Sequence, residues 1–238
     1  MKKLFVAGCS FSDYTKVEHA YGEILAGKLN YQYVHEGAGC GSNWRIWRTI
    51  TKHILDGNLT SDDLLIIQYT ELTRNEFHSV LAQPKYVYEP RTIDNLPITD
   101  IRDDGFVIRY KFGADVWQNN KEESEFFKLY TKYFVNINFA EEQFLTHHHM
   151  FQHMLINNNI KTIFVASDRN HPKSFFLRQH TLPNFIPYMF SEPTDKTDCE
   201  KYNLTPGDWG HLNQKGHEVF AGWLYDHIYN NKILLDSK

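Results

Sequence analysis

The sequence predicts a three-layer α/β protein built on a mostly parallel central sheet. Short apolar runs of strand length alternate along the chain with longer segments in which apolar residues recur at helical spacing. The chain has 238 residues, of which 42% are hydrophobic and 23% charged, a composition typical of a globular protein. This length is enough to bury one sizeable core, so we expect a single domain over residues 1–238.

The N-terminal part of the chain follows the strand–helix alternation of a doubly wound sheet. The expected elements, in order, are a strand at 4–7, a helix at 20–30, a strand at 31–35, a helix at 44–55 and a strand at 64–69. Both helices carry apolar residues along one face, and Ser42 or Asn43 is suited to cap the second one. The run at 64–69 is typical of a parallel strand that is buried on both faces.

The remainder of the chain is less regular. Residues 84–113 contain three prolines and a predicted hairpin over 106–112, which follows the turn pair Asp104-Gly105. We interpret this segment as an insertion over one end of the sheet, in the position of a lid. The expected later elements are helices at 122–134 and 140–157, a strand at 161–166, an irregular segment at 172–205 and a closing helix at 214–229.

Composition argues against several kinds of partner. A net charge of −4 and a pI near 6.3 give no electrostatic basis for binding nucleic acid or an anionic membrane. The three cysteines (Cys9, Cys40 and Cys199) are too few and too scattered for a disulfide framework, so we expect free thiols. The apolar stretch before Cys9 is shorter than the roughly 7–15 residues of a signal sequence, and no apolar run reaches the roughly 18 residues of a membrane span. We therefore expect a cytoplasmic protein.

The first strand leads directly into Gly8-Cys9-Ser10-Phe11-Ser12, which puts a hydroxyl group at its carboxyl end. Ligands of open α/β sheets bind at this edge. A serine hydroxyl becomes a useful nucleophile only with an adjacent base and with donors for the developing oxyanion. Because serine in such a turn also caps helices, the motif alone leaves both interpretations open.

A candidate base lies near the other end of the chain, in Asp208-Trp209-Gly210-His211. The segment follows Pro206-Gly207 and precedes the closing helix, so we expect a loop whose polar side chains face the edge of the sheet. The spacing allows the Asp208 carboxylate to orient the His211 imidazole while the other ring nitrogen faces a hydroxyl group. A surface aspartate with a helix-capping histidine is the alternative.

Taken together, the two ends of the chain resemble the SGNH (GDSL-like) hydrolase family. The family carries Gly-Asp-Ser-x-Ser after its first strand and Asp-x-x-His before its last helix; here Cys9 replaces the Asp of the first block. The resemblance implies a flavodoxin-like SGNH fold with Ser10 as the nucleophile and with Asp208 and His211 as its partners. It also implies that Gly39 or Gly41, in the turn after the second strand, donates a backbone N–H to the oxyanion.

The third block departs from the family pattern. The family usually has Gly-x-Asn-Asp after the third strand, where the Asn side chain helps to bind the oxyanion. By position Thr70 stands for the Gly and Leu72 for the Asn, and leucine has no donor. The segment resembles that of a divergent subgroup with an aromatic-Ser/Thr-x-x-x-Arg-x-Glu pattern, in which Thr70 or Arg74 supplies the missing donor or binds substrate. The loss of one oxyanion donor costs roughly 10²–10³ in rate.

Two further patterns point to cofactors only weakly. Gly37-x-Gly39-x-Gly41 follows a strand, but Ser42 stands where the third glycine of a dinucleotide-binding loop belongs. His149 and His153 are spaced as a metal-binding pair on a helix, yet the same helix carries apolar residues that favour solvent-facing histidines. We expect neither a metal nor an organic cofactor.

The sequence therefore predicts a serine esterase that cleaves an oxygen ester through Ser10, His211 and Asp208. The expected substrate is a small-molecule or glycan ester, such as an acetylated carbohydrate. Two alternatives stay open. One is a catalytically weak or inactive module that binds a glycan or a protein in the same cleft, and the other is an O-acyltransferase. The oligomeric state is not predicted.

Overall fold

The structure is a computed structural model of the chain. It describes residues 1–9, 12, 17–38, 41–70, 72, 75–78, 92–93, 96–97, 106–110, 125, 129–130, 132–133, 137–166, 185–187 and 211–234. Among these residues, no helix is both long and apolar enough to cross a membrane.

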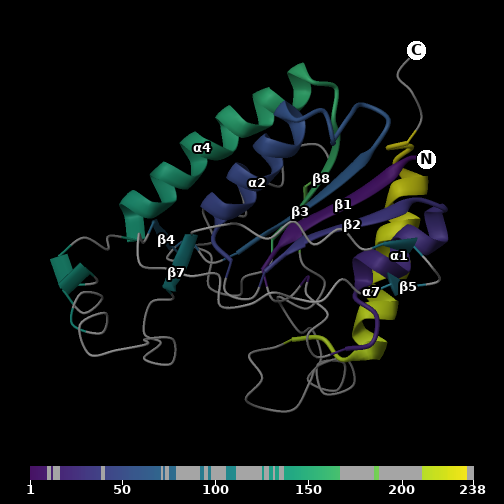
Figure 1. Ribbon diagram of the computed structural model, residues 1–238, viewed down its shortest axis with the longest axis horizontal. Helices are drawn as coiled ribbons and strands as arrows, with labels where there is room; N and C mark the ends of the chain where they lie inside the picture. The colour runs from purple at the N-terminus through teal and green to yellow at the C-terminus, as the bar shows by residue number, and fades with distance from the viewer. Residues whose placement is uncertain are drawn as a thin grey trace.

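A five-stranded parallel sheet forms the centre of the fold (Figure 1). Its strands are β1 (Lys3–Gly8), β2 (Gln32–Gly37), β3 (Leu64–Tyr69), β8 (Lys161–Ala166) and β9 (Phe185–Pro187). They are arranged in the order β2-β1-β3-β8-β9. The chain therefore moves outward from β1 to β2, returns past β1 to β3, and continues to the opposite edge. This reversal creates a switch point between β1 and β3, where open α/β sheets bind their ligands at the carboxyl ends of the strands.

Helices cover both faces of the sheet, as predicted (Figure 1). They are α1 (Tyr21–Leu29) and α7 (Gln214–Asn230) on one face, and α2 (Asn43–Leu55) and α4 (Ile137–Asn157) on the other. Successive side chains of a strand point to opposite faces. Leu4 and Val6 of β1 accordingly belong to the core that includes α1 and α7, whereas Phe5 and Ala7 belong to the core that includes α2 and α4.

The helix ends are fixed by local chemistry. Ser42 caps α2, because its Oγ accepts the N–H of Arg45 at 3.1 Å, and Asn213 caps α7 in the same way through the N–H of Gly216 at 2.9 Å. Helix α1 ends at Asn30, which adopts the left-handed conformation with φ of 57°. This conformation is tolerated by asparagine better than by most residues, and it lets the chain turn directly into β2.

The structure confirms the predicted three-layer α/β fold and differs in two details. Strand β9 forms within the segment predicted to be irregular. The strand expected in a local hairpin is β7 (Phe106–Tyr110), and its antiparallel partner is the distant β4 (Asn75–His78). A separate pair, β5 (Thr92–Ile93) with β6 (Leu96–Pro97), also lies in the segment predicted to be an insertion. The interpretation of residues 84–113 as a lid stays a prediction, because most of them lie outside the described residues.

Candidate active site

The candidate site lies at the carboxyl ends of β1, β2 and β3. The register aligns Gly8 of β1 with Gly37 of β2, and Ala7 with Ile67 of β3, so the segments that follow these strands leave the sheet at the same edge. The proposed nucleophile Ser10 follows β1, and Thr70 follows β3. These are the two strands that flank the switch point.

The exit of β1 is held by a buried polar cluster. Ser12 Oγ donates a hydrogen bond to Gln68 Oε1 and lies 3.0 Å from the hydroxyl oxygen of Tyr21. Because Ser12 has one proton and gives it to Gln68, the Tyr21 hydroxyl is the donor in the second bond. Burial raises the pKa of Tyr21, so this hydroxyl stays protonated at physiological pH.

Gly8 is required at this exit because the space for a side chain is occupied. A Cβ atom there would lie 3.0 Å from Cβ of Gln68 and 3.1 Å from Cβ of Ser12, and it would also collide with Ser12 Oγ. Cys9 follows as a fully buried free thiol. The residue before the predicted nucleophile is therefore packed inward and does not face solvent.

The turn after β2 folds back on β1. The N–H of Ala38 donates to the carbonyl of Gly8 at 3.2 Å, and the N–H of Gly41 donates to the carbonyl of Ala38 at 2.8 Å. The Gly41 N–H is thus used inside the turn. Gly39, the other glycine expected to bind the oxyanion, lies outside the described residues, so its role stays a prediction.

Asn43 connects this turn to the end of β3. Its Oδ1 accepts the N–H of Thr70 at 2.9 Å, and its Nδ2 donates to the carbonyl of Thr70 at 3.0 Å. Both polar groups of the Thr70 backbone are therefore satisfied by one buried side chain. We call this pair the Asn43–Thr70 clamp.

The clamp uses only the backbone of Thr70 and leaves its side-chain hydroxyl without a hydrogen bond among the residues described. Thr70 is buried, and its Oγ1 has no hydrogen-bond partner within the described part of the chain. Leu72, in the position of the family's Asn, packs against the apolar core between the sheet and α2. At these two positions, the only side chain able to donate a hydrogen bond is that of Thr70.

A buried charged network lies behind the turn after β2. Arg45 Nη1 donates to the carbonyl of Glu36 at 2.8 Å, and its Nη2 lies 3.6 Å from Glu36 Oε2. His53 Nε2 lies 2.7 Å from Glu36 Oε1. The opposite charges and the hydrogen bond to the main chain fix the last residues of β2, from which the turn departs.

His148 belongs to a second buried hydrogen-bond network, on the α4 side of the sheet. The hydroxyl oxygen of Tyr69 lies 2.7 Å from His148 Nδ1 and 3.4 Å from Trp47 Nε1. Because the indole N–H can only donate, the Tyr69 hydroxyl accepts from Trp47 and donates to His148. Burial, with a smaller effect of His149, lowers the pKa of His148 to about 4, so the ring is neutral at physiological pH. His148 is therefore part of the core, and no cluster of three metal-binding side chains occurs among the residues described.

His211 precedes the first turn of α7, in a segment that is anchored to the core. Leu212 is fully buried against the cluster that includes α1 and α7, and Asn213 caps the helix. His211 itself is half-buried and close enough to His217 to contribute to lowering the pKa of that residue. Ser10, Arg74 and Asp208 lie outside the described residues, so their roles stay predictions.

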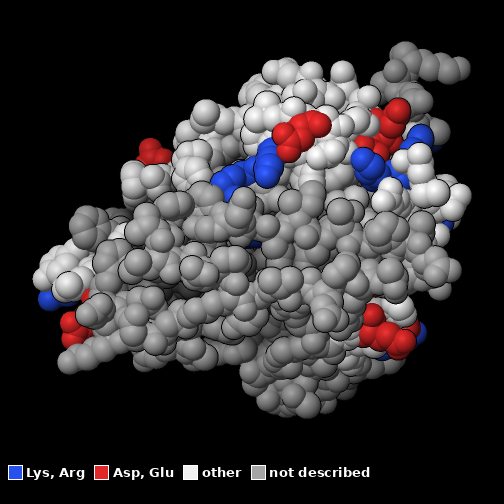
Figure 2. Space-filling view, in the orientation of Figure 1, with Lys and Arg blue, Asp and Glu red and all other residues white. Residues whose placement is uncertain are grey.

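The described charges on the face shown in Figure 2 are mixed in sign. Lysine and arginine side chains lie beside aspartate and glutamate over the upper part of this view, with no extended patch of one sign among the residues described.

Comparison with known proteins identifies the fold. No protein-family model matches the chain, and no curated protein matches it by sequence. Among solved structures, the chain is similar to a protein assigned to the G-D-S-L lipolytic family from Desulfitobacterium hafniense DCB-2. The TM-score is 0.52 and the identity 9%, over 98% of this chain and 100% of that one. It is also similar to the lipase Lip_vut3 from a goat rumen metagenome, with a TM-score of 0.50 and 9% identity over 94% of this chain and 96% of that one. The chain has the fold of these lipolytic proteins, which confirms the fold implied by the resemblance of its sequence.

Proposed function

We propose that this chain is a serine hydrolase of the SGNH type that cleaves an oxygen ester. The proposal assigns Ser10 as the nucleophile, His211 as the general base and Asp208 as the residue that orients the imidazole. The fold supports this assignment, since similar folds occur in proteins described as lipolytic. The sequence motifs supply the specific residues.

One observation of the structure carries most of the argument. The backbone N–H of Tyr21 donates to His217 Nδ1 at 3.0 Å, and the Tyr21 hydroxyl bonds to Ser12. These two bonds connect the segment after Ser10 to the helix that begins just after His211. The two ends of the chain, which are separated by about two hundred positions, are therefore neighbours in the fold.

The proposed reaction proceeds through an acyl-enzyme. Ser10 Oγ attacks the ester carbonyl while its proton passes to His211, and a tetrahedral oxyanion forms. The intermediate collapses when the C–O bond to the alcohol breaks and His211 returns the proton to the departing oxygen. A water molecule, deprotonated by His211, then attacks the acyl carbonyl. The bond from the acyl carbon to Ser10 Oγ breaks, His211 returns the proton to Oγ, and the acid is released.

The oxyanion requires preorganised donors. We assign the backbone N–H groups of Ser10 and Gly39 to this role, because the N–H of Gly41 already bonds to Ala38. The buried hydroxyl of Thr70 is the proposed third donor, in place of the family's Asn. Arg74 is the proposed contact to the remainder of the substrate, which we take to be a small-molecule or glycan ester.

Hydrolysis of a panel of esters tests this proposal. The panel should include p-nitrophenyl acetate, longer p-nitrophenyl esters and an acetylated sugar. Wild-type protein is expected to hydrolyse at least one of them, with a loss of at least roughly 10³-fold in kcat for Ser10→Ala and for His211→Ala. Thr70→Val keeps the shape of the side chain, and is expected to lower kcat by roughly 10²-fold through the loss of one donor.

Leu72 supports one competing function. Its apolar packing removes the donor that active members of the family usually carry at this position. A binding module that retains the cleft without catalysis would show no Ser10-dependent turnover of any ester, while still binding a glycan or protein ligand. An O-acyltransferase would share the acyl-enzyme, but would give transfer product when a sugar alcohol is added.

A further inference from the structure

The first turn of α7 is hydrogen-bonded to the segment just before α1, which lies nearly two hundred positions earlier in the sequence. Gln214 Oε1 accepts two backbone N–H groups, those of Glu18 and His19, each at 3.0 Å. Gln214 Nε2 returns a bond to the carbonyl of His19 at 3.3 Å. One side chain therefore satisfies three main-chain groups in a segment without regular secondary structure.

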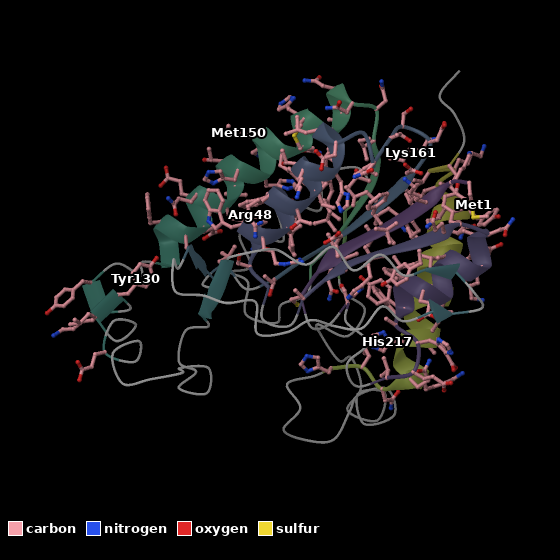
Figure 3. The ribbon with its side chains drawn as sticks, in the orientation of Figure 1. Met1, Arg48, Tyr130, Met150, Lys161 and His217 are labelled. Atoms are coloured by element: carbon pink, nitrogen blue, oxygen red, sulfur yellow. The ribbon has the colours of Figure 1, made fainter. Side chains whose placement is uncertain are left out.

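His217 continues this set of bonds one turn further along α7. Its Nδ1 accepts the N–H of Tyr21 at 3.0 Å, and its ring stacks on that of Tyr21 with the centroids 6.0 Å apart. Figure 3 shows His217 near the start of α7, away from Met1, which precedes β1, and from Lys161 at the amino end of β8. Because a backbone N–H can only donate, Nδ1 is the unprotonated nitrogen of this ring.

Tyr21 passes the connection on to the exit of β1. Its hydroxyl donates to Ser12 Oγ at 3.0 Å and lies 3.4 Å from Gln68 Oε1. Tyr21 and Ser12 are fully buried, and His217 is 3% exposed. The bonds therefore form in a region that excludes water, where each is stronger and costlier to break than on the surface.

We propose that Gln214 and His217 are positioning residues, which fix the His211 segment against the turn that carries Ser10. The inference rests on the proposed function and assigns a role that the sequence motifs do not contain. His211 is three residues before Gln214, and Ser10 is two residues before Ser12. The bonds of His217, Tyr21 and Ser12 thus join the start of α7 to the exit of β1, and those of Gln214 join it to the segment before α1.

The state of the His217 ring agrees with this role. Burial, and in second place the nearby His211, lower the pKa of His217 to about 4. The ring is therefore neutral at physiological pH and keeps its acceptor nitrogen available to Tyr21. A histidine that took up a proton here would lose the acceptor and would place a second positive charge near a protonated His211.

A matched pair of substitutions tests the role of His217. Asparagine carries an acceptor oxygen near the position of the histidine Nδ1. Leucine has nearly the same shape as asparagine but no acceptor. We expect His217→Leu to slow the second-order labelling of Ser10 by a fluorophosphonate about 10- to 100-fold, since small misplacements of catalytic groups cost rates of this size. His217→Asn should recover most of that loss. Gln214→Leu and Gln214→Glu form a second pair. Glu keeps the acceptor for the two backbone N–H groups, but its second oxygen repels the His19 carbonyl, so Gln214→Glu should recover only part of the loss seen in Gln214→Leu.

Two controls separate positioning from general damage. His227→Leu makes the same change about three turns further along α7 and is expected to label at the wild-type rate. Hydrogen exchange of the Tyr21 amide, measured by NMR, reports the bond to His217 directly and needs no activity. We expect faster exchange in His217→Leu than in His217→Asn.

The outcomes distinguish this inference from the proposed function. Equal labelling rates for the wild type, His217→Leu and Gln214→Leu would overturn the positioning role while leaving the proposed function intact. An unchanged Tyr21 exchange rate in His217→Leu would overturn it as well, because the bond would not exist in solution. Absence of Ser10-dependent labelling in the wild type would overturn the proposed function, and the catalytic consequence of these bonds with it.

Discussion

Replacement of Asn43 tests how much the buried Asn43–Thr70 clamp contributes to the stability of the fold at the candidate site. Asn43 is 4% exposed and Thr70 1% exposed, so water cannot replace the two hydrogen bonds of the Asn43–Thr70 clamp. In Asn43→Leu the shape is kept, but the N–H and the carbonyl of Thr70 lose their partner. Each unsatisfied buried group costs about 1–3 kcal/mol, so the expected loss in the free energy of unfolding is about 2–6 kcal/mol.

This loss is large against a total stability of about 5–15 kcal/mol. For a chain of this size it corresponds to a fall in Tm of roughly 4–24 °C, at about 2–4 °C per kcal/mol. Circular dichroism during heating and during urea titration measures both quantities. A change in unfolding free energy below about 1 kcal/mol for Asn43→Leu would refute the reasoning, since it would show that the clamp satisfies no buried group.

Asn43→Asp extends this test, because its loss of stability should depend on pH in a direction that can be predicted. The carboxylate still accepts the Thr70 N–H, but its second oxygen faces the Thr70 carbonyl and repels it. Burial and this repulsion should raise the pKa of the new carboxyl group, and the protonated form can donate to the carbonyl. The deficit of Asn43→Asp relative to the wild type should therefore shrink as the pH falls from 7 to 5, whereas that of Asn43→Leu should stay constant. A deficit for Asn43→Asp that grows towards acid pH would contradict this account.

Further predictions concern packing and protonation. Gly22→Ala should destabilise the protein relative to Gly27→Ala by about 1–3 kcal/mol in urea unfolding, because a Cβ at Gly22 lies 2.7 Å from Val6 Cγ2 while nothing lies within 4 Å of one at Gly27. Equal stabilities would show that α1 is not packed tightly on the sheet. The pKa values of His148 and His217 fall from 6.5 to about 4 on folding, so the unfolded chain binds more protons than the folded chain between these values. Stability should thus decrease as the pH falls from about 7 to 4, by on the order of 3 kcal/mol for each histidine (2.5 × 1.36). His148→Phe should reduce this pH dependence, and an unchanged dependence would show that His148 is not buried as a neutral ring.

The sequence predicts the layers of this fold well because each central strand and its helices carry a strong local pattern. The run at Leu64–Tyr69 and the apolar faces of α1 and α2 are visible without any knowledge of tertiary contacts. Strand β9 escapes prediction because three residues ending in proline carry no alternation, and only pairing with β8 makes them a strand. The turn pair before β7 is a local signal and predicts a local hairpin, whereas the true partner β4 is about thirty positions away in sequence.

In the candidate site, too, local motifs can be predicted from the sequence, whereas contacts between distant residues cannot. The motif positions of Ser10, Asp208 and His211 follow from the resemblance, and their roles stay proposals. The clamp between Asn43 and Thr70 was not predicted, because its partners are 27 positions apart and one of them contributes only backbone atoms. The sequence instead offers Asn43 as one of two candidates for the cap of α2, and the structure gives that role to Ser42.

The contacts of Gln214 and His217 are missed for a similar reason. Their partners are backbone groups nearly two hundred positions away, and no short motif records such a pairing. Polar side chains are common at exposed helix ends, so those on the first turn of the closing helix do not indicate buried contacts. Only the fold shows that this turn is partly buried against the start of α1.

The central claim is that Ser10 is a nucleophile activated by His211, and mass spectrometry of the covalent adduct tests it most directly. Wild-type protein would be treated with a fluorophosphonate, and the modified peptide would be mapped and compared with Ser10→Ala and His211→Ala. We predict a single adduct on Ser10 in the wild type, none at this position in Ser10→Ala, and a labelling rate at least roughly 10³-fold lower in His211→Ala. An unmodified Ser10 in folded wild-type protein, or an equal rate after loss of His211, would contradict the claim.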